Sequence, residues 1–265
     1  MMQARMEARV VAAGRGWQWL VEGFGLFGKS PAKWITLTIA LALLWAVSLI
    51  IPVLGPLLFN LLSPLLFAGL MIGCRALENG EPLEFAHLFA AFRQQAAPLV
   101  TIGGVYLVGT IMVVGIVLVI AGSPTLPAVL PKPGTDIETL RVAARSMALA
   151  FAVGAAVYLP LLMLIWFAPL LVVFDGLAPV AAMRLSFAAC VRNMLPFLVY
   201  SAAIVLLWLV LSLPAALGAI GGLLVIALLV ASIPVLICSI YASYNDIFPN
   251  RNLSANSPTN RQSSS

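Results

Sequence analysis

The chain has 265 residues, of which 63% are hydrophobic and only 9% are charged. A soluble globular domain carries roughly a quarter charged residues, so this composition excludes an ordinary soluble protein and predicts a multi-pass membrane protein. The net charge of +5 does not indicate nucleic acid as a partner, because the basic residues are scattered between apolar stretches. The three cysteines, Cys74, Cys190 and Cys238, lack CxxC spacing, and they predict neither a disulfide framework nor a zinc site.

Six apolar stretches are long enough to cross a bilayer as helices, which takes roughly 20 residues each. They run approximately over residues 34–54, 57–74, 99–121, 147–174, 197–217 and 219–241. Each stretch is continuously apolar rather than alternating, which favours helices over the strands of a barrel. Short turns containing glycine join the first pair and the last pair. We therefore expect an all-α polytopic protein whose six transmembrane helices form three hairpins.

The basic residues predict the orientation of these spans. Of the 14 Lys and Arg residues, eleven fall on one side of the expected topology. They are Arg5, Arg9, Arg15, Lys29, Lys33, Arg75, Arg93, Arg184, Arg192, Arg251 and Arg261. Only Lys132, Arg141 and Arg145 fall on the other side. Because basic residues remain on the cytoplasmic side, both termini are expected there, with the protein in a bacterial inner membrane.

A short amphipathic segment precedes each expected hairpin, and the three segments resemble one another. FAAFRQQAAP begins at Phe89 and FAACVRNMLP at Phe187, while the first segment, FGLFGKSP, begins at Phe24 and is shorter. The expected apolar stripes are Trp17, Leu20, Val21 and Phe24; then Phe85, Leu88, Phe89 and Phe92; then Met183, Phe187, Cys190 and Met194. Such helices lie flat in the headgroup region. Their interfacial anchors are predicted to be Phe24, Phe89, Phe92, Arg93, Phe187 and Arg192.

These features define three regions. Residues 1–33 form a cytoplasmic N-terminus with an interfacial helix, and no cleaved signal peptide is expected because a long apolar core is missing there. Residues 34–244 form the transmembrane domain, with interfacial helices at about 82–95 and 179–194 and a periplasmic loop at 122–140. Residues 245–265 are polar and low in complexity, which predicts a disordered cytoplasmic tail.

The motifs before the hairpins resemble those of uncharacterised bacterial six-helix inner-membrane proteins. Most of the likeness lies in GLMIGCRALENGEPLEFAHLFAAFR, supported by RGWQWLVEGFGLFGKSP and FAACVRNMLPFLVY. It extends over roughly residues 15–245, without the loop at 122–140 and the tail. The resemblance implies a fold and an inner-membrane location, and it assigns no activity or functional residue.

An acidic run between the second and third spans raises the alternative of a metal or acid/base site. Glu78, Glu81, Glu84 and His87 recur every three residues. Carboxylate di-iron bundles use two Glu-x-x-His pairs, whereas this chain has one histidine. Gly80 and Pro82 interrupt the helix, so the four residues cannot share one face. We therefore expect the water-facing start of an interfacial helix that Pro82 opens, and no metal site.

Two features within the spans are candidate sites. Gly69 and Gly73 form a small-xxx-small pattern, which is typical of close helix packing within a chain or between chains. Asn60, Ser63, Pro64 and Pro160 are candidate cavity residues. The prolines either kink helices that pack normally or form broken helices that line a cavity.

The six stretches contain no Asp, Glu, Lys, Arg or His. Such residues usually mark proton relays, ion-coupled transport and intramembrane chemistry. We therefore expect a protein that is not an enzyme, with no catalytic residue, no cofactor and no metal. The favoured function is that of a scaffold, assembly factor or organiser of surrounding lipid. The alternative is an uncoupled transporter or channel for an apolar or lipidic solute. Expected partners are membrane lipids and other membrane proteins.

Overall fold

The computed structural model describes residues 7–121 and 137–249, and every regular element in these ranges is a helix. In chain order the elements are α1 (Arg15–Gly28), α2 (Pro31–Ser48), α3 (Leu54–Glu78), the 3-10 helix η1 (Phe85–Phe89), α4 (Ala90–Gln94), α5 (Ala96–Ala121), α6 (Ile137–Ile165), α7 (Ala168–Asp175), α8 (Pro179–Arg192), α9 (Met194–Ser212), the 3-10 helix η3 (Leu213–Leu217) and α10 (Ala219–Ile247). Six helical stretches are long and apolar enough to cross a membrane, so the predicted all-α polytopic fold is confirmed. The predicted loop at 122–140 lies mostly outside the described residues, and α6 already begins at Ile137.

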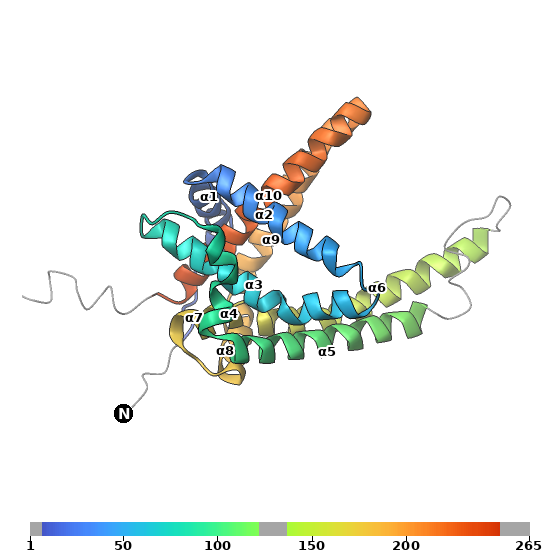
Figure 1. Cartoon of the computed structure of the whole chain (residues 1–265). Coiled ribbons are helices and arrows are strands. Elements are labelled where there is room, and N and C mark those ends of the chain that lie inside the picture. The colour runs from blue at the N-terminus through green and yellow to red at the C-terminus, as the bar shows by residue number, and fades with distance from the viewer. Residues whose placement is uncertain (1–6, 122–136, 250–265) are drawn as a thin grey trace, which may run out of the picture.

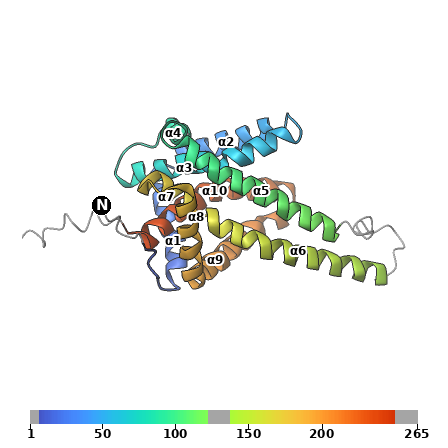
Figure 2. The same cartoon turned by 90° about the horizontal axis from the view of Figure 1, so that it is seen from below.

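Three pairs of long helices, α2–α3, α5–α6 and α9–α10, extend from a common hub (Figure 1). The hub consists of α1, η1, α4, α7 and α8, together with the adjoining ends of α3 and α10. In Figure 1 the outer part of α10 points away from α5 and α6, and Figure 2 shows α2 and α3 set apart from α6. The α9–α10 pair therefore points away from the α5–α6 pair, whereas α3 packs along α5, where Gly103 lies against the backbone of Leu61.

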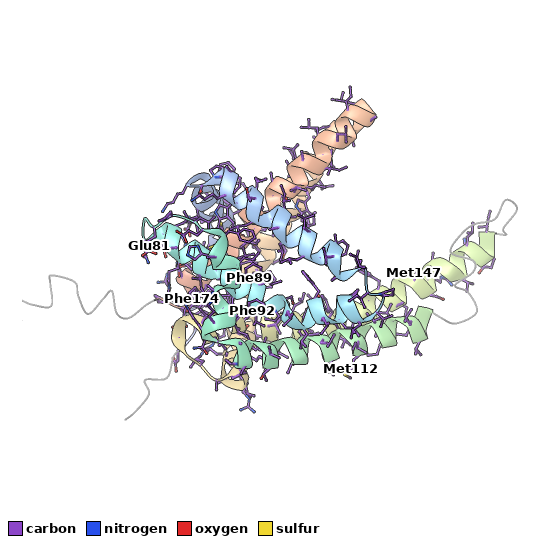
Figure 3. The ribbon with its side chains drawn as sticks, in the orientation of Figure 1. Glu81, Phe89, Phe92, Met112, Met147 and Phe174 are labelled. Carbon is purple, nitrogen blue, oxygen red and sulfur yellow. The ribbon has the colours of Figure 1, made fainter. Side chains whose placement is uncertain are left out.

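The main core lies at the hub and not along the spans. Trp19, Trp34 and Phe167 are fully buried there and belong to one continuous apolar cluster. In the most apolar stretch of α3, 50% of the residues are buried, against 11% in α5 and in α9. Figure 3 shows apolar side chains projecting outward, among them Met112 and Met147. Most of the surface of α5 and α9 thus faces the surroundings of the protein.

The turns at the outer ends of two helix pairs depend on unusual backbone conformations. Val53, before α3, has φ 66°, a left-handed conformation that β-branched residues rarely adopt. A side chain at Gly55 would place its Cβ 1.7 Å from the carbonyl oxygen of Ser48, so only glycine fits this turn. Between η3 and α10, Gly218 has φ 74°, where glycine carries no steric penalty.

The predicted fourth span at 147–174 is wrong as one continuous helix. Its helix starts earlier, at Ile137, ends at Ile165 and is followed by the separate helix α7. Pro169 has no backbone N–H to continue the hydrogen-bond ladder, which explains the break. The Ser186 hydroxyl on α8 bridges the break, because it donates to the Met163 carbonyl at 2.7 Å and accepts from the Phe167 N–H at 3.0 Å.

The segment predicted as one interfacial helix at 82–95 is instead η1 followed by α4. The helix is not opened by Pro82, because Glu84 is its N-cap and forms a capping box with His87. A 3-10 helix has fewer residues per turn than an α-helix, so its side chains point in directions that an α-helical period does not predict. Leu88 and Ala91 are fully buried, whereas Phe89 of the predicted stripe is 40% exposed. Ala91 therefore faces the protein.

On α8 and α1, some members of the predicted stripes are buried in the protein and others are exposed. On α8 the buried residues are Ala182, Met183, Ser186, Ala189 and Cys190. The predicted stripe members Phe187 and Met194 are exposed. On α1, Leu20 is buried while Trp17, Val21 and Phe24 are exposed. The face of each helix that meets the protein combines small residues with large ones, such as Gly23 with Trp19 on α1 and Ala182 with Met183 on α8.

The expected boundary between the transmembrane domain and the tail, at residue 245, falls inside a helix. α10 continues to Ile247, so Asn245 and Asp246 are helical. The rest of the predicted tail, from residue 250 onward, lies outside the described residues.

Candidate functional site

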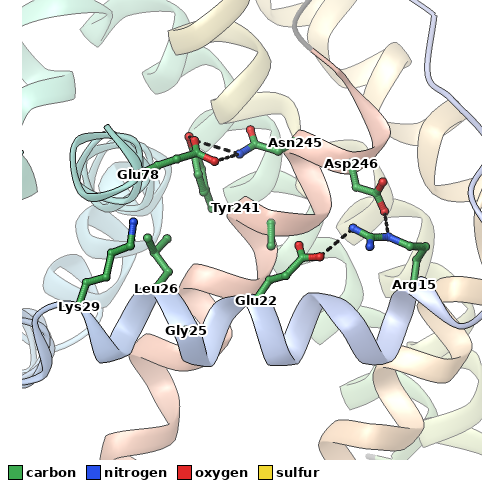
Figure 4. Close-up of a pocket in the computed structure, with 10 residues that line it drawn as sticks. Arg15, Glu22, Gly25, Leu26, Lys29, Glu78, Tyr241, Asn245 and Asp246 are labelled. Carbon is green, nitrogen blue, oxygen red and sulfur yellow. Dashed lines mark hydrogen bonds and ion pairs between the residues drawn. The ribbon is translucent and has the colours of Figure 1, made fainter. Parts of the chain in front are cut away.

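A hollow of about 650 Å³ lies at the hub, between α1 and the ends of α3 and α10 (Figure 4). α1 contributes Arg15, Glu22 and Lys29 to its lining, and α3 contributes Glu78. The end of α10 contributes three polar residues, Tyr241, Asn245 and Asp246. The sequence predicted none of these residues as a site. The end of α10 lies far from the others in the sequence, since Asp246 is 231 residues from Arg15 and Tyr241 is 163 residues from Glu78, so no local motif reveals the group.

Asp246 is the centre of one half of this hollow. Its carboxylate accepts a hydrogen bond from Nε of Arg15 at 2.5 Å and another from the indole Nε1 of Trp19 at 2.9 Å. The Asp246 side chain is only 9% exposed, and such a charge is stable only with partners of this kind. Arg15 also pairs with Glu22 at 3.0 Å. This carboxylate therefore fastens α1 to the end of α10.

The pKa of Arg15 reflects the same contacts. Burial lowers the pKa of the guanidinium, but the hydrogen bond and the charge of Asp246 outweigh burial, so the net shift is upward. Arg15 thus stays charged at every physiological pH, and the link between α1 and α10 does not respond to pH through this residue.

Glu78 occupies the other half of the hollow. It accepts the Tyr241 hydroxyl at 2.5 Å and the amide of Asn245 at 3.2 Å. The Lys29 ammonium donates to the carbonyl of Leu77 at 2.9 Å, close to the end of α3. The ends of α1, α3 and α10 are therefore held together by side chains from all three helices.

Two further contacts complete the hub. The Tyr244 hydroxyl of α10 donates to the carboxylate of Asp175 at the end of α7. The Arg75 guanidinium lies 3.8 Å from the centre of the Phe174 ring, a cation–π contact. Successive turns of α10 thus bind α3, α7 and α1.

Asn193, at the junction of α8 and α9, is a fully buried polar residue that sequence reasoning missed. Its Oδ1 accepts the Val11 N–H at 2.9 Å, and its amide donates to the carbonyls of Arg9 and Ala189 at 3.0 and 2.9 Å. It fixes the chain before α1 against the hub. A single Asn next to a predicted helix end is too common a pattern to mark this role.

The polar side chains of the hollow join helices to one another. The carboxylates of the hollow accept hydrogen bonds from basic, hydroxyl, indole or amide groups. Within residues 7–121 and 137–249, no three His, Cys, Asp or Glu side chains gather to hold a metal ion. His87, of the acidic run, accepts the Glu84 N–H through Nδ1 at 2.9 Å, so it caps η1. Glu78 of the same run is part of the hub instead.

The candidate packing residues Gly69 and Gly73 both lie against the segment that precedes α4. A Cβ at Gly69 would approach the carbonyl oxygens of His87 and Leu88 to 2.5 Å, and one at Gly73 would lie 2.7 Å from a methyl of Leu83. These glycines therefore let η1 pack directly onto α3.

The candidate cavity residues separate in space. Ser63 and Pro64 line a second, mostly apolar pocket between α3, α5, α6, α7 and α10. Pro160 is on the exposed face of α6, and Asn60 is not among the residues that line this pocket, so two of the four candidates line it. Pro160 is one of the many span residues that face outward.

The predicted anchors differ in exposure. Phe24, Phe89 and Phe187 are 65%, 40% and 37% exposed, and Arg93 and Arg192 are also exposed. Phe92 is partly buried and packs against the core, at 6.0 Å from the Phe89 ring. Of the aromatic anchors, only Phe24 is mostly exposed, while Phe89 and Phe187 are partly covered by protein.

Six apolar spans joined by a polar hub define a multi-pass integral membrane protein. The chain is 30% identical over 258 residues to the probable inner membrane protein BTH_II0599 of Burkholderia thailandensis, covering 92% of this chain and 94% of that relative. The chain belongs to the same family of bacterial inner-membrane proteins. No family model and no solved structure matches it. The resemblance drawn from the repeated motifs is confirmed at the level of an inner-membrane family.

Proposed function

We propose that the protein is a non-catalytic scaffold of the inner membrane, which holds membrane partners and surrounding lipid in the angles between its helix pairs. The observation that carries this proposal is the low burial of the spans, 11% in the most apolar stretches of α5 and α9. An enclosed path for a solute needs helices that close around it. Helices whose sides are largely uncovered instead present surfaces that other membrane proteins and lipids can contact.

The polar contacts of the hub support the same proposal. Asp246, Glu78 and Asp175 are each bound by a side chain of another helix, which fixes the angles at which the pairs leave the hub. A scaffold requires such fixed angles, because its partners must meet preformed surfaces. We propose membrane proteins and lipids as the partners, with no nucleic acid, no cofactor and no enzymatic reaction.

Photo-crosslinking in living cells tests this function. A photoreactive amino acid is placed at Val108 on α5 or at Leu209 on α9, which are 58% and 60% exposed. A scaffold gives discrete protein adducts from at least one of these positions. The matched control is Ile220 at the outer start of α10, which is 82% exposed and lies far from the hub. Adducts with lipid alone at all three positions would contradict a protein scaffold.

The orientation belongs to the same proposal, with the hub and both termini on the cytoplasmic side. It is supported by the gathering of Arg15, Lys29 and Arg75 at the hub, while Arg141 and Arg145 lie near the opposite end of α6. Single cysteines in a cysteine-free background test it. A cysteine at residue 80 should react with an impermeant maleimide only after the cells are opened, whereas one at residue 132 should react from outside. The reverse pattern would overturn the orientation.

A transporter of apolar solutes is the second candidate, favoured by the pocket that Ser63 and Pro64 line. Its volume of about 260 Å³ is below the usual range for sites that enclose a drug-sized ligand. Purified protein in liposomes distinguishes the two functions. A carrier exchanges a fluorescent lipid between leaflets faster than empty liposomes do, and a scaffold does not.

A further inference from the structure

The pocket of about 260 Å³ lies where two helices are interrupted by proline. Pro64 lies inside α3, and Pro169 follows the break between α6 and α7. Pro64 cannot donate to the Asn60 carbonyl, and the Ser63 hydroxyl donates to that carbonyl instead, at 2.8 Å. Interrupted helices inside a membrane are tolerated where they border a cavity or other protein. This pocket is such a place.

Its walls are apolar, but two hydrogen-bond donors remain available there. The indole Nε1 of Trp166, a lining residue, is buried and has no hydrogen-bond partner among the described residues. Buried N–H groups in proteins are nearly always paired, so this one indicates a missing acceptor. The hydroxyls of Tyr106 and Tyr158 lie 3.0 Å apart. Since only one of them can donate to the other, one phenolic hydrogen remains for a further acceptor.

The complement of these donors is a molecule that accepts hydrogen bonds but is otherwise apolar. A carbonyl oxygen meets this requirement. Ser63 lies 15 residues before the end of α3 at Glu78, which is about 22 Å of helix at 1.5 Å per residue, whereas Ile240 directly precedes Tyr241 of the hub. The pocket therefore extends from beside the hub into the hydrocarbon region. The ester carbonyls of phospholipids remain near the headgroups. A carbonyl that enters this depth belongs to an apolar ring or chain.

We propose that this pocket binds the carbonyl-bearing ring of a quinone-type membrane molecule, with the Trp166 indole and the tyrosine pair donating to its oxygens. The small volume suits a single ring, and the apolar tail of such a molecule remains in the surrounding lipid. The binding involves no reaction. This inference does not rest on the scaffold function, because a scaffold or a carrier could hold such a molecule.

The test measures binding of tritiated decylubiquinone to the purified, tagged full-length protein in detergent by scintillation proximity. The wild type should bind it saturably, and excess decylbenzene, which has a similar tail but no carbonyl, should not displace it. Trp166→Phe removes the N–H and should weaken binding roughly tenfold, and Tyr106→Phe should weaken it several-fold. The matched control Trp208→Phe alters an exposed indole on α9 and should leave binding unchanged.

Three results would overturn the proposal. One is the lack of saturable binding by the wild type. Another is displacement by decylbenzene, which would make the pocket merely apolar. The third is stronger displacement by dioctanoylglycerol than by unlabelled quinone, which would assign the pocket to lipid esters. Since the wild-type measurements decide these three outcomes, the proposal stays testable even if a variant fails to fold. Photo-crosslinking at α5 and α9 tests the scaffold function separately.

Discussion

The Sγ atoms of Cys74 on α3 and Cys238 on α10 lie 3.9 Å apart, although 164 residues separate them in the chain. Both thiols are fully buried. A disulfide requires about 2.05 Å between the sulfurs, so a small movement of two side chains would join them. This proximity reports directly on the packing of α3 against α10, on which the hub depends.

Oxidation with copper phenanthroline should therefore link these two cysteines. A protease site inserted between α5 and α6 separates Cys74 from Cys238 after cleavage. The oxidised, cleaved protein should run as one band on a non-reducing gel, and Cys238→Ala should run as two. Cys190→Ala is the control and should still give one band. If Cys190→Ala, and not Cys238→Ala, released the fragments, the packing of α3 against α10 would be wrong.

Ser186→Ala should destabilise the protein, because it leaves the N–H of Phe167 and the carbonyl of Met163 without their bridge. An unsatisfied buried polar group costs about 1–3 kcal/mol. The measurement is the melting temperature from size-exclusion profiles of heated, detergent-purified protein. Ser212→Ala is the matched control, since its exposed hydroxyl bonds only within its own helix. Equal melting of both variants would show that the break in the fourth span does not need Ser186.

Gly23 and Gly25 should respond in opposite ways to alanine. A Cβ at Gly23 would lie 2.6 Å from the backbone nitrogen of Ser239, so Gly23→Ala must push α1 away from α10 and lower the melting temperature. A Cβ at Gly25 meets no atom within 4 Å. Gly25→Ala should therefore gain up to about 1 kcal/mol from helix propensity. A loss of stability in both variants would mean that α1 does not pack as described.

The reactivity of Cys190 should depend on pH in an unusual way. Burial raises the pKa of its thiol to about 12. At pH 8 only about one thiol in 10⁴ is then ionised, and the thiolate is the reactive form. In a variant with Cys74→Ala and Cys238→Ala, maleimide labelling should be slow and rise about tenfold per pH unit from 7 to 9.

A cysteine introduced at the exposed position Gly80 provides the reference for this measurement. Its thiol should titrate near the ordinary value of about 8.5, so its labelling rate should level off above that pH. A similar levelling for Cys190 would show that α8 does not bury it against α6.

The candidate sites were only partly predictable from the sequence. Gly69 and Gly73 stood out because small residues four apart are a recognisable packing pattern. Asp246 did not, because it falls where the polar tail seemed to begin and its partner Arg15 is 231 residues away. The contacts that build the hub join residues far apart in the sequence. Without these contacts, each of the polar residues looks like one that commonly occurs at the end of a helix.

The face of a helix that packs against the protein was predictable only where the opposite face meets water. In a membrane both sides of a helix are apolar, because lipid tails are as apolar as leucine. Hydrophobic periodicity on α1 and α8 therefore did not show which apolar residues pack against the protein. The surfaces that pack include small residues such as Ala182 and Ala189, while Phe187 and Val21 face outward.

By itself the sequence determined that the protein is helical, that it belongs in a membrane and that it has six spans. These features follow from the free-energy cost of placing unpaired backbone groups or charges in lipid, and this cost applies to each segment independently. Only the tertiary structure decided where the fourth span breaks, which helix ends meet at Asp246 and Glu78, and which faces of the spans remain open. These features depend on contacts such as that of Ser186 with Met163, whose free energy exists only once distant segments have packed.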